Sequence, residues 1–598
     1  MRDFFKYTFA TLTGLILFCG LGIGGLIFLA VSAASTDNGL KVKQDSMLVL
    51  DLETSIRDTQ PASTTGEAIE RSLSGEQTNT LPLRTVLQTL EEAASDDRIT
   101  GLYLKGSSSP GLSGYATLGE VRAALKTFRE SGKPIIAYDR DWSEREYYLG
   151  SIANTIAIDP LGIVELNGLS AETLFMAGAL EKYGIGVQVV RVGSYKAAVE
   201  PFTRKENSPE NRQQTQKLLS DLWNEYLNTV SEYRELDSAA MQSIAQTQGL
   251  LVAEDAQTQG LVDRIAYDDE IVSELKALTE SDEDDTSFRQ ISVGTYADIT
   301  GISNGDRNAS EGHVAVVYAT GAIVDGEGLP SEIGGDRFAE ILRELRLDED
   351  VAAIVLRINS PGGSASASET IKREVELIAE EKPIVISMGN VAASGGYWIA
   401  MKGSYIFAEP TTITGSIGVF GLLFNVQEIA NNNGLTWDAV KTAPFADTQT
   451  VSRPKTAAEL AVIQKIVDRI YWRFIREVAT GRELTQERVN EIAQGRVWSG
   501  LAAKDIGLVD EIGGLEAAIA AAAGQAELGD DPKVREYPRI PSFEEQLIEN
   551  LIGEASTATP SDPLTAQWKQ LQKEFASLRE MNDPLGVYTR LPYNFEID

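Results

Sequence analysis

The first part of the chain contains one long stretch without charged residues, from Tyr7 to Thr36. Its apolar centre, Leu12 to Val31, has about the 20 residues that a helix needs to cross the hydrocarbon core of a membrane. This pattern predicts a retained transmembrane helix. The alternative is a cleaved signal peptide, which the small residues at 30–34 favour. Both interpretations export the rest of the chain.

Charged residues on either side of the stretch predict its orientation. Arg2 and Lys6 precede it, and Asp37 follows it. Because positive residues collect on the cytoplasmic side of a span, residues 1–36 are predicted as a cytoplasmic N-terminus and a membrane anchor. The body after Asp37 is then extracytoplasmic, with the plasma membrane and the thylakoid membrane as the two candidate locations.

The pattern of apolar runs after the anchor repeats at a spacing of about 250 residues, which indicates a duplicated fold. Each copy has an apolar strand ending in a Ser-Pro-Gly turn, then a Lys-Pro pair, an aromatic pair and a Gly-Leu-Val-Asp run. The landmarks are Ser109–Gly111, Lys133–Pro134, Tyr147–Tyr148 and Gly260–Asp263 in the first copy, and Ser360–Gly362, Lys382–Pro383, Tyr397–Trp398 and Gly507–Asp510 in the second. Four landmarks in one order are not explained by coincidence.

Short β-branched runs alternate with helical periods in both copies, which is typical of βα units around a parallel sheet. The predicted fold class is therefore α/β, with two tandem repeats behind an N-terminal transmembrane helix. A polar, turn-rich segment separates the repeats. The predicted units are the anchor (1–36), a first repeat (45–279), a linker (280–312), a second repeat (313–536) and a C-terminal tail (537–598), for which only a packing or assembly role is predicted.

Two residue types are almost missing from the chain, and this restricts its chemistry. One histidine, His313, and one cysteine, Cys19, occur among 598 residues. A zinc site of the usual kind, a thiol nucleophile and an intrachain disulfide are therefore not expected. His313 lies where the linker meets the apolar run 314–318, and it is predicted to be a surface residue rather than the base of a catalytic triad. Any nucleophilic hydrolysis is predicted to use another base, without a metal or organic cofactor.

The charge balance argues against nucleic acid as a partner. Acidic residues outnumber basic ones by 88 to 53, which gives a formal net charge of -35. A surface of this charge repels phosphate backbones and anionic lipid headgroups.

Differences between the two copies indicate where chemistry takes place. In the second copy small residues surround Ser394, as at turns where a nucleophile projects from a strand-to-helix junction. Counting back from the aromatic pair, the first copy has Glu144 at this position and so lacks a nucleophile. The first copy instead contains Lys196, which aligns within a residue or two with Ala446 of the second. The two copies are therefore complementary, with the serine in one and the lysine in the other.

A lysine can serve as a general base only if its pKa falls from about 10.4 towards neutrality, and burial produces such a shift. A site between the two copies would provide that burial for Lys196. A helix beginning at Gly395 would direct its amide groups at a developing oxyanion. The pair Gly362–Gly363 after a strand is, taken alone, more typical of a turn than of an oxyanion hole.

At these residues the sequence resembles the signal peptide peptidase A family, also called protease IV, in its long two-repeat form. The resemblance covers the chain from the anchor to about residue 540. The segments that carry it are Tyr195–Phe202, Asn359–Gly363, Met388–Trp398 and Thr414–Gly418.

The resemblance implies a ClpP/crotonase-type fold in each repeat and a serine peptidase with a catalytic Ser–Lys dyad. It assigns Ser394 as nucleophile and Lys196 as base, and it places the backbone N–H groups of Gly363 and Gly395 in the oxyanion hole. The implied substrates are signal peptides left in the membrane after preprotein processing and other short apolar peptides. Family members form ring-like oligomers, so a homo-oligomer, by resemblance a tetramer, is expected.

Two other classes of function stay open at this point. An acyl-CoA enzyme of the crotonase type would share the fold and a glycine-lined oxyanion hole. A membrane scaffold without catalysis would be favoured if Lys196 were exposed and far from Ser394.

Overall fold

The computed structural model describes residues 41–59, 80–106, 113–234, 236–304, 312–529, 531–538 and 587–591. The predicted anchor, Cys19, the turn at Ser109–Gly111 and most of the predicted tail lie outside these ranges. Within the ranges given, no helix is both long enough and apolar enough to cross a membrane.

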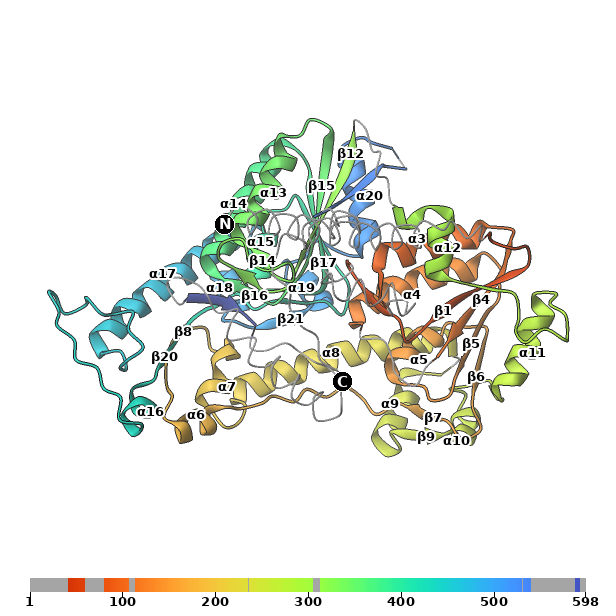
Figure 1. The fold of residues 1–598 in the computed structure, drawn as a ribbon, viewed down its shortest axis with the longest axis horizontal. Coiled ribbons are helices and arrows are strands. Elements are labelled where there is room, and N and C mark those ends of the chain that lie inside the picture. Colours follow the sequence, from red (N-terminus) through yellow and green to blue (C-terminus); the bar gives the residue numbers. More distant parts are fainter. Residues whose placement is uncertain are drawn as a thin grey trace, which may run out of the picture.

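The first half of the chain forms a parallel 6-stranded sheet (Figure 1). In spatial order its strands are β10 (Arg264–Ile265), β6 (Thr155–Ile158), β5 (Ile135–Asp139), β4 (Ile99–Lys105), β1 (Ser46–Asp51) and β11 (Gln290–Ser292). Its helices are α3 (Leu83–Ser95), α4 (Tyr115–Glu130), α5 (Glu144–Gly150), α6 (Ala177–Tyr183), α7 (Glu200–Thr203), α8 (Pro209–Arg234), α9 (Ser238–Thr247), α10 (Ala253–Thr258), α11 (Asp268–Leu278) and α12 (Val293–Thr300). The first half also contains two separate two-stranded sheets. One pairs β2 (Ser55–Arg57) with β3 (Thr80–Pro82), and the other pairs β7 (Ile163–Glu165) with β9 (Leu250–Val252).

The second half repeats this plan around an 8-stranded sheet. Its strands are β21 (Val497–Ser499), β19 (Ile413–Gly415), β17 (Ile384–Ala393), β15 (Val351–Ser360), β12 (His313–Thr320) and β23 (Val534–Tyr537), with β18 (Tyr405–Ala408) on β17 and β22 (Glu511–Ile512) on β18. The pair β19–β21 is antiparallel and the other pairs are parallel. Its helices are α13 (Gly335–Leu347), α14 (Ala365–Glu381), α15 (Gly395–Ala400), α16 (Gln427–Asn432), α17 (Ala457–Gly481), α18 (Gln486–Ile492), α19 (Gly500–Asp505) and α20 (Leu515–Gln525).

Side chains alternate between the two faces of each sheet, because successive residues of a strand point in opposite directions. In β1, Leu48 and Leu50 face the core under α3, α4 and α5, whereas Met47 and Val49 face α11. The second half has the same arrangement, with α13, α14, α15 and α17 on one face of the sheet and α20 on the other. Both faces are covered, which explains why the strands read as nearly continuous apolar runs.

Corresponding hydrogen bonds confirm the duplication. The hydroxyl of Tyr147 donates to the carbonyl of Leu261, and the hydroxyl of Tyr397 donates to the carbonyl of Leu508. In each repeat the Gly-Leu-Val-Asp run therefore lies against the helix that carries the aromatic pair, α5 in the first repeat and α15 in the second. Glu144 and Ser394 each lie three residues before the tyrosine of their helix, although Ser394 is the N-cap residue of α15 and Ser143 is the N-cap residue of α5.

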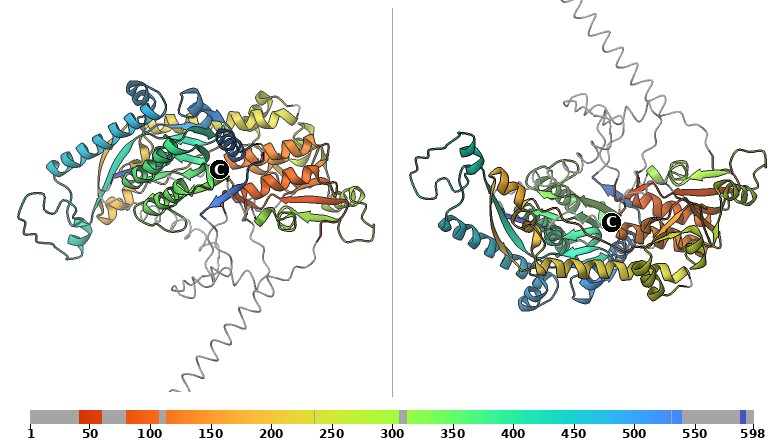
Figure 2. Two further views of the ribbon diagram at one scale, coloured as in Figure 1. Left: turned by 90° about the horizontal axis from the view of Figure 1, so that it is seen from above. Right: turned by 90° about the horizontal axis from the view of Figure 1, so that it is seen from below.

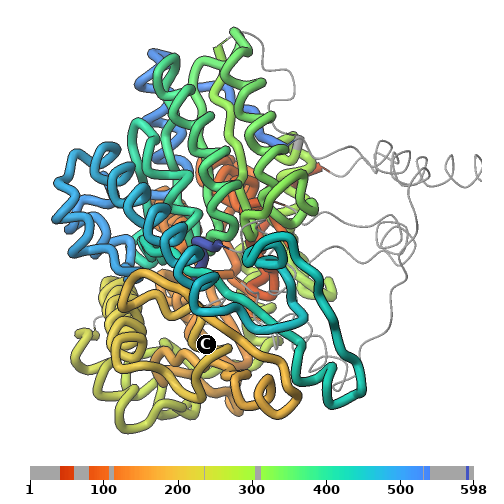
Figure 3. Tube along the Cα trace, turned by 90° about the vertical axis from the view of Figure 1, so that its left-hand side faces the viewer, coloured from red at the N-terminus to blue at the C-terminus, as the bar shows by residue number. Residues whose placement is uncertain are grey.

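A third sheet joins the halves and was not predicted. Its strands, in spatial order, are β14 (Ile333–Gly334), β13 (Ile323–Val324), β16 (Gly362–Ser364), β24 (Val587–Arg590), β20 (Val419–Asn425) and β8 (Gly186–Val192). β8 belongs to the first half and pairs antiparallel with β20 of the second. β24, from the predicted tail, lies between β16 and β20 and is the short dark blue segment in Figure 3.

Helix α8 also connects the two halves, and Figure 2 shows it lying across both of them in yellow. Leu218 and Leu222, in its first part, pack with Ile413 and Val497 of the second half. The later part of the helix packs in the core of the first half through Trp223, Tyr226, Leu227 and Val230. One amphipathic helix thus contributes to the cores of both repeats.

A buried ionic cluster lies between α4 and the second sheet. Arg357 of β15 donates from Nε to Asp58 at 2.9 Å and from Nη2 to Glu120 of α4. Its remaining terminal nitrogen, Nη1, donates to Ser387 at 2.8 Å. The side chains of Arg357, Asp58 and Glu120 are almost fully buried, so each charge depends on the others for compensation.

Part of the predicted linker belongs to the first sheet. Residues 290–300 form β11 and α12, and β11 pairs in parallel with β1. The hydroxyl of Tyr296 in α12 also donates to Asp96 at 2.8 Å. The strand has three residues, too few to stand out from the polar residues before it.

The prediction that His313 is a surface residue is wrong, since its exposed fraction is 0%. It is the first residue of β12, which lies between β15 and β23, so strands on both sides cover it. The parallel strand β15 begins with Val351 beside His313 and ends with Ser360 beside Ala392 of β17. Val351 and Ser360 are nine residues apart, which is about 30 Å along a strand. His313 therefore lies at the opposite end of the strands from Ser394.

Candidate active site

Ser394 connects strand β17 to helix α15 and has an unusual backbone conformation. Its φ is 57° and its ψ is -109°, a backbone conformation that residues other than glycine rarely adopt. Two hydrogen bonds hold it there, from its N–H to the Gly415 carbonyl and from the Trp398 N–H to its own carbonyl, both 2.8 Å long. Such a junction projects a side chain from the end of a sheet and suits a nucleophile.

Lys196 reaches Ser394 from the first half of the chain through the third sheet. It follows β8, whose last residue, Val192, lies beside Val419 at the start of β20. The segment before β20 continues back to β19, which pairs with the end of β17 immediately before Ser394. The register of these strands therefore brings together two residues that are 198 positions apart.

The amino group of Lys196 has three hydrogen-bond partners. Its Nζ lies 2.7 Å from Ser394 Oγ, 3.0 Å from the Ser416 carbonyl oxygen and 3.1 Å from Ser416 Oγ. A neutral amine has two N–H donors and one lone pair. The two oxygens of Ser416 can accept the two N–H bonds, which leaves the lone pair to accept the hydroxyl proton of Ser394. The site thus fits a neutral lysine.

Burial favours this neutral form. The exposed fractions of Lys196 and Ser394 are both 0%. Burial lowers the pKa of Lys196 well below its ordinary value, because the ammonium form loses its solvation. The condition that would favour a scaffold, an exposed lysine distant from the serine, is not met.

Two glycines fit closely around the lysine. A Cβ on Gly495, whose φ is +77°, would lie 2.6 Å from both the backbone nitrogen and the Cβ of Lys196. A Cβ on Gly418 would lie 3.1 Å from Cδ of the same side chain. Larger residues at these positions would push the amino group away from Ser394, so the two glycines allow the lysine to approach the serine.

The predicted oxyanion glycines lie on two segments next to Ser394. Gly395 is the first residue of α15, and the N–H groups of a helix's first turn have no acceptor within the helix. Gly363 lies in β16, and a Cβ on it would come 1.9 Å from the Ile323 carbonyl. A Cβ on Gly362 would lie 2.6 Å from the Gly395 nitrogen, so β16 runs directly past the start of α15.

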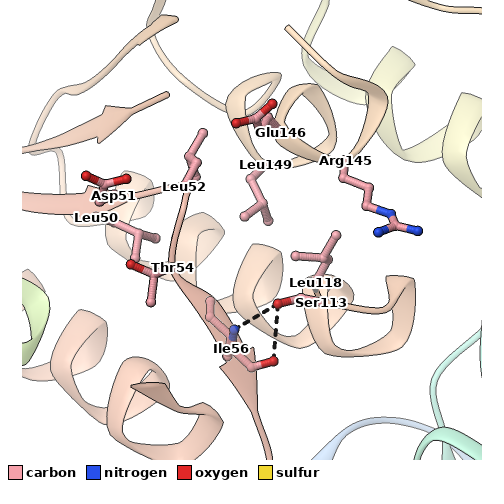
Figure 4. A pocket seen from close by; sticks show the side chains of 10 residues that line it. All are labelled: Leu50, Asp51, Leu52, Thr54, Ile56, Ser113, Leu118, Arg145, Glu146 and Leu149. Carbon is pink, nitrogen blue, oxygen red and sulfur yellow. Dashed lines mark hydrogen bonds between the residues drawn. The ribbon is translucent and has the colours of Figure 1, made fainter. Parts of the chain in front are cut away.

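The position in the first half that corresponds to Ser394 contains a carboxylate, and a pocket lies nearby beside the same helix. Glu144 at the start of α5 accepts hydrogen bonds from the N–H groups of Asn167 and Gly168, at 2.7 and 2.8 Å. Burial raises its pKa. The pocket in Figure 4 lies between the end of β1 and α5, and Ser113 at its edge bonds to both backbone groups of Ile56. The residues that line the pocket include Ser113 but no lysine, so they contain no Ser–Lys pair.

Ser416, whose two oxygens contact Lys196 Nζ, was not predicted as a site residue. Its only signal in the sequence was membership of the segment Thr414–Gly418, which carried the family resemblance. The structure gives it a specific position, since its N–H donates to the Arg496 carbonyl at 2.7 Å and its hydroxyl donates to the Gly495 carbonyl at 3.4 Å. No metal-binding group of three or more histidine, cysteine or acidic residues occurs in the part of the chain that the structure describes.

Removal of the Ser416 hydroxyl should weaken catalysis without abolishing it. We expect Ser416→Ala to lower kcat by about 5- to 100-fold, the effect of losing one buried hydrogen bond of roughly 1–3 kcal/mol. An oxygen that accepts from Nζ favours the ammonium form, so its loss should leave the apparent pKa of the base unchanged or lower it. The measurement is kcat and KM against pH for a peptide substrate. Ser404→Ala, which removes a hydroxyl bonded to Ile384 at the far end of β17, is the matched control. A higher apparent pKa in the pH profile of Ser416→Ala would contradict a role of this hydroxyl as acceptor from Lys196 Nζ.

A buried serine in contact with a lysine, beside the amide groups at a helix N-terminus, is the arrangement of a hydrolase that uses lysine as its base. The comparison with protein families agrees with this class. The model for peptidase family S49 matches the chain twice, at residues 127–282 and 376–529. The chain therefore belongs to peptidase family S49 and is a serine peptidase with two family repeats.

Similar proteins extend over nearly the whole chain. It is 35% identical to Protease 4 of Salmonella typhi, over 90% of this chain and 89% of that protein. It is 33% identical to Protease 4 of Haemophilus influenzae, over 94% of each. The chloroplastic serine protease SPPA of Arabidopsis thaliana is 32% identical over 76% of this chain and 67% of its own length. A ClpP1 mutant of Listeria monocytogenes is a solved structure that overlaps 35% of this chain and 94% of its own at 17% identity, with a TM-score of 0.24.

Proposed function

We propose that Ser394 is the nucleophile and Lys196 the general base of this peptidase. The contact of 2.7 Å between Nζ and Oγ, with both side chains fully buried, is the observation that carries the proposal. Neutral Lys196 takes the hydroxyl proton while Ser394 Oγ attacks the scissile carbonyl. The resulting alkoxide is stabilised by backbone N–H groups of Gly395 and Gly363.

The second half of the cycle uses the same two residues. Protonated Lys196 gives its proton to the leaving amine as the peptide C–N bond breaks, and an acyl-enzyme forms on Ser394. Lys196 then takes a proton from a water molecule that attacks the ester carbonyl, and it returns this proton to Ser394 Oγ as the ester bond breaks and the new carboxyl end is released. Lys196 is therefore the residue that accepts and returns the proton in both halves of the cycle.

The substrates that fit this proposal are signal peptides and other short apolar peptides. The name of one relative, a putative signal peptide peptidase of Enterococcus faecium that is 32% identical over 39% of this chain, supports the assignment. A membrane anchor in residues 1–36, with the body outside the cytoplasm, would place the site near such peptides. A ring-like homo-oligomer, a tetramer by resemblance, completes the proposal.

The domain organisation within this proposal follows the predicted units with one change. The first ClpP/crotonase-like repeat extends from 45 to 300, because β11 and α12 join its sheet. The linker then covers 301–312, the second repeat 313–536, and the tail 537–598.

Labelling with a fluorophosphonate tests the proposal directly. The probe should modify Ser394 and no other serine, because only an activated hydroxyl attacks phosphorus. The labelling rate should rise with pH through a transition well below the value for free lysine, about 10.4, because the neutral form of Lys196 is the active one and burial lowers its pKa. The rate is measured by mass spectrometry of the labelled peptide at each pH. A transition near the free-lysine value would mean a solvated lysine and reject this mechanism. Labelling elsewhere would instead favour another hydrolytic site.

A further inference from the structure

The C-terminal segment 587–591 occupies the middle of the third sheet. β24 is antiparallel to both of its neighbours, with Thr589 opposite Gly363 and Tyr588 opposite Phe420. Beyond the strand, the N–H of Leu591 donates to the Pro361 carbonyl at 2.8 Å. An extended segment held between two strands by backbone hydrogen bonds is the geometry of peptide recognition by strand addition.

This segment also closes the candidate active site. All five of its residues are buried, and the exposed fractions of Thr589, Ser394 and Lys196 are 0%. A nucleophile that cuts external peptides has to contact their carbonyl groups. With β24 in place, an external peptide cannot reach Ser394 along the sheet, because the position between β16 and β20 is filled.

The backbone of Thr589 lies where the carbonyl of a substrate is needed. A Cβ on Gly362 would be 2.2 Å from the Thr589 carbonyl oxygen and 2.6 Å from the Gly395 nitrogen. A Cβ on Gly395 would be 3.0 Å from the same carbonyl oxygen. The Thr589 carbonyl therefore lies beside the first amide of α15, the group assigned to the oxyanion hole.

The side chains on either side of Thr589 fill apolar sites built by both halves. Tyr588 packs with Ala198, Val199 and Phe202, the residues that follow Lys196, and its ring lies 5.8 Å from that of Phe420. Leu591 packs with Leu218 and Leu222 of α8 and with Ile413 and Val497. Between them, Thr589 Oγ1 donates to the Gly363 carbonyl at 3.4 Å and lies 3.0 Å from a Cβ placed on Gly395, which leaves room for a small side chain only. The segment thus fits three neighbouring sites, for an aromatic residue, a small residue and an aliphatic residue.

We infer that residues 587–591 are an internal substrate mimic, which occupies the peptide-binding strand and competes with external substrates. The inference rests on the proposed function of Ser394 and adds a regulatory role for the tail. It also defines the preferred substrate as an extended peptide with a small residue at the position of Thr589, an aromatic residue before it and an aliphatic residue two positions after it.

Removal of the segment should increase activity. A tethered competitor acts at an effective concentration of about millimolar, so a chain ending at Gly586 should show kcat/KM for a small peptide raised by roughly tenfold or more. The point variant Tyr588→Asp, which places a charge between Phe202 and Phe420, should have the same effect in the full chain. Tyr588→Phe, which keeps the ring, should raise kcat/KM much less than Tyr588→Asp does. Thermal unfolding of each variant identifies any that fail to fold.

Binding is measured separately from catalysis. A fluorescent peptide of residues 584–594 should bind the shortened chain that carries Ser394→Ala, detected by anisotropy, and should bind the full-length Ser394→Ala chain at least about tenfold more weakly. A peptide of the same composition in scrambled order is the control.

The two assays separate the inference from the function on which it rests. Unchanged kcat/KM after shortening, together with no binding of the 584–594 peptide, would overturn the inference while leaving a working peptidase. Specific peptide binding to the shortened Ser394→Ala chain, with no peptide hydrolysis by any variant, would uphold the occupied strand and reject the proposed function.

Discussion

Ser394→Ala and Lys196→Met should each lower kcat/KM for peptide hydrolysis by about 10⁴-fold or more, because residues of a catalytic unit act together. The double variant should be no slower than either single variant for the same reason. Methionine keeps the volume of the lysine stem beside Gly418 and Gly495, so the loss should reflect the missing amine rather than a cavity. The measurement is hydrolysis of a fluorogenic peptide by the purified protein, with circular dichroism to verify folding.

His313→Gln provides the control for this experiment. His313 is the chain's single histidine and lies at the end of the strands opposite to Ser394. The turnover of this variant should therefore equal that of the unmodified protein. A large fall in turnover with the fold intact would reopen a mechanism based on histidine. Near-normal hydrolysis by the Lys196→Met variant would exclude lysine as the base.

Arg357→Met should destabilise the protein by about 3–5 kcal/mol, the cost of leaving buried carboxylates without their cation. Arg357 compensates the charges of Asp58 and Glu120 of the first half. Its loss leaves two buried carboxylates without a cation between the repeats. Burial already raises the pKa of Glu120, and removal of the arginine raises it further. A raised pKa in the folded state favours stability at low pH, so the destabilisation should grow as the pH rises through this pKa.

Urea unfolding at pH 5 and pH 8 measures this effect. Arg343→Ala is the matched control, since its pair with Glu374 is half exposed on the arginine side and should contribute no more than about 1 kcal/mol. Addition of Glu120→Gln to Arg357→Met should recover part of the stability by removing one charge. Equal destabilisation by the Arg357 and Arg343 variants would show that the cluster between the halves has no special importance.

Much of the architecture could be predicted because it depends on local pattern. The βα alternation, the duplication and the complementary positions of Ser394 and Lys196 all follow from short segments whose order is visible in one chain. Small residues around Ser394 indicate a tight junction by themselves, because only such residues allow the backbone to turn sharply there.

The remaining features depend on pairing between distant segments. The third sheet combines strands from residues 186 to 590, and four of its strands, β13, β14, β16 and β24, have only two to four residues, too few to be recognised from sequence. The buried position of His313 depends on β23, whose place beside β12 no local signal reveals. Ser416 acts through its geometry relative to Lys196, which appears only after β8 and β20 pair.

The pairing of β8 with β20 determines when activity can arise during synthesis. Lys196 leaves the ribosome long before Ser394, and the two meet only after a closure of about 200 residues, a slow step in folding. A nascent or truncated first repeat has a lysine but no nucleophile, and a free second repeat has a serine but no base. If the two residues act as proposed, the peptidase stays inert until both repeats are complete and docked.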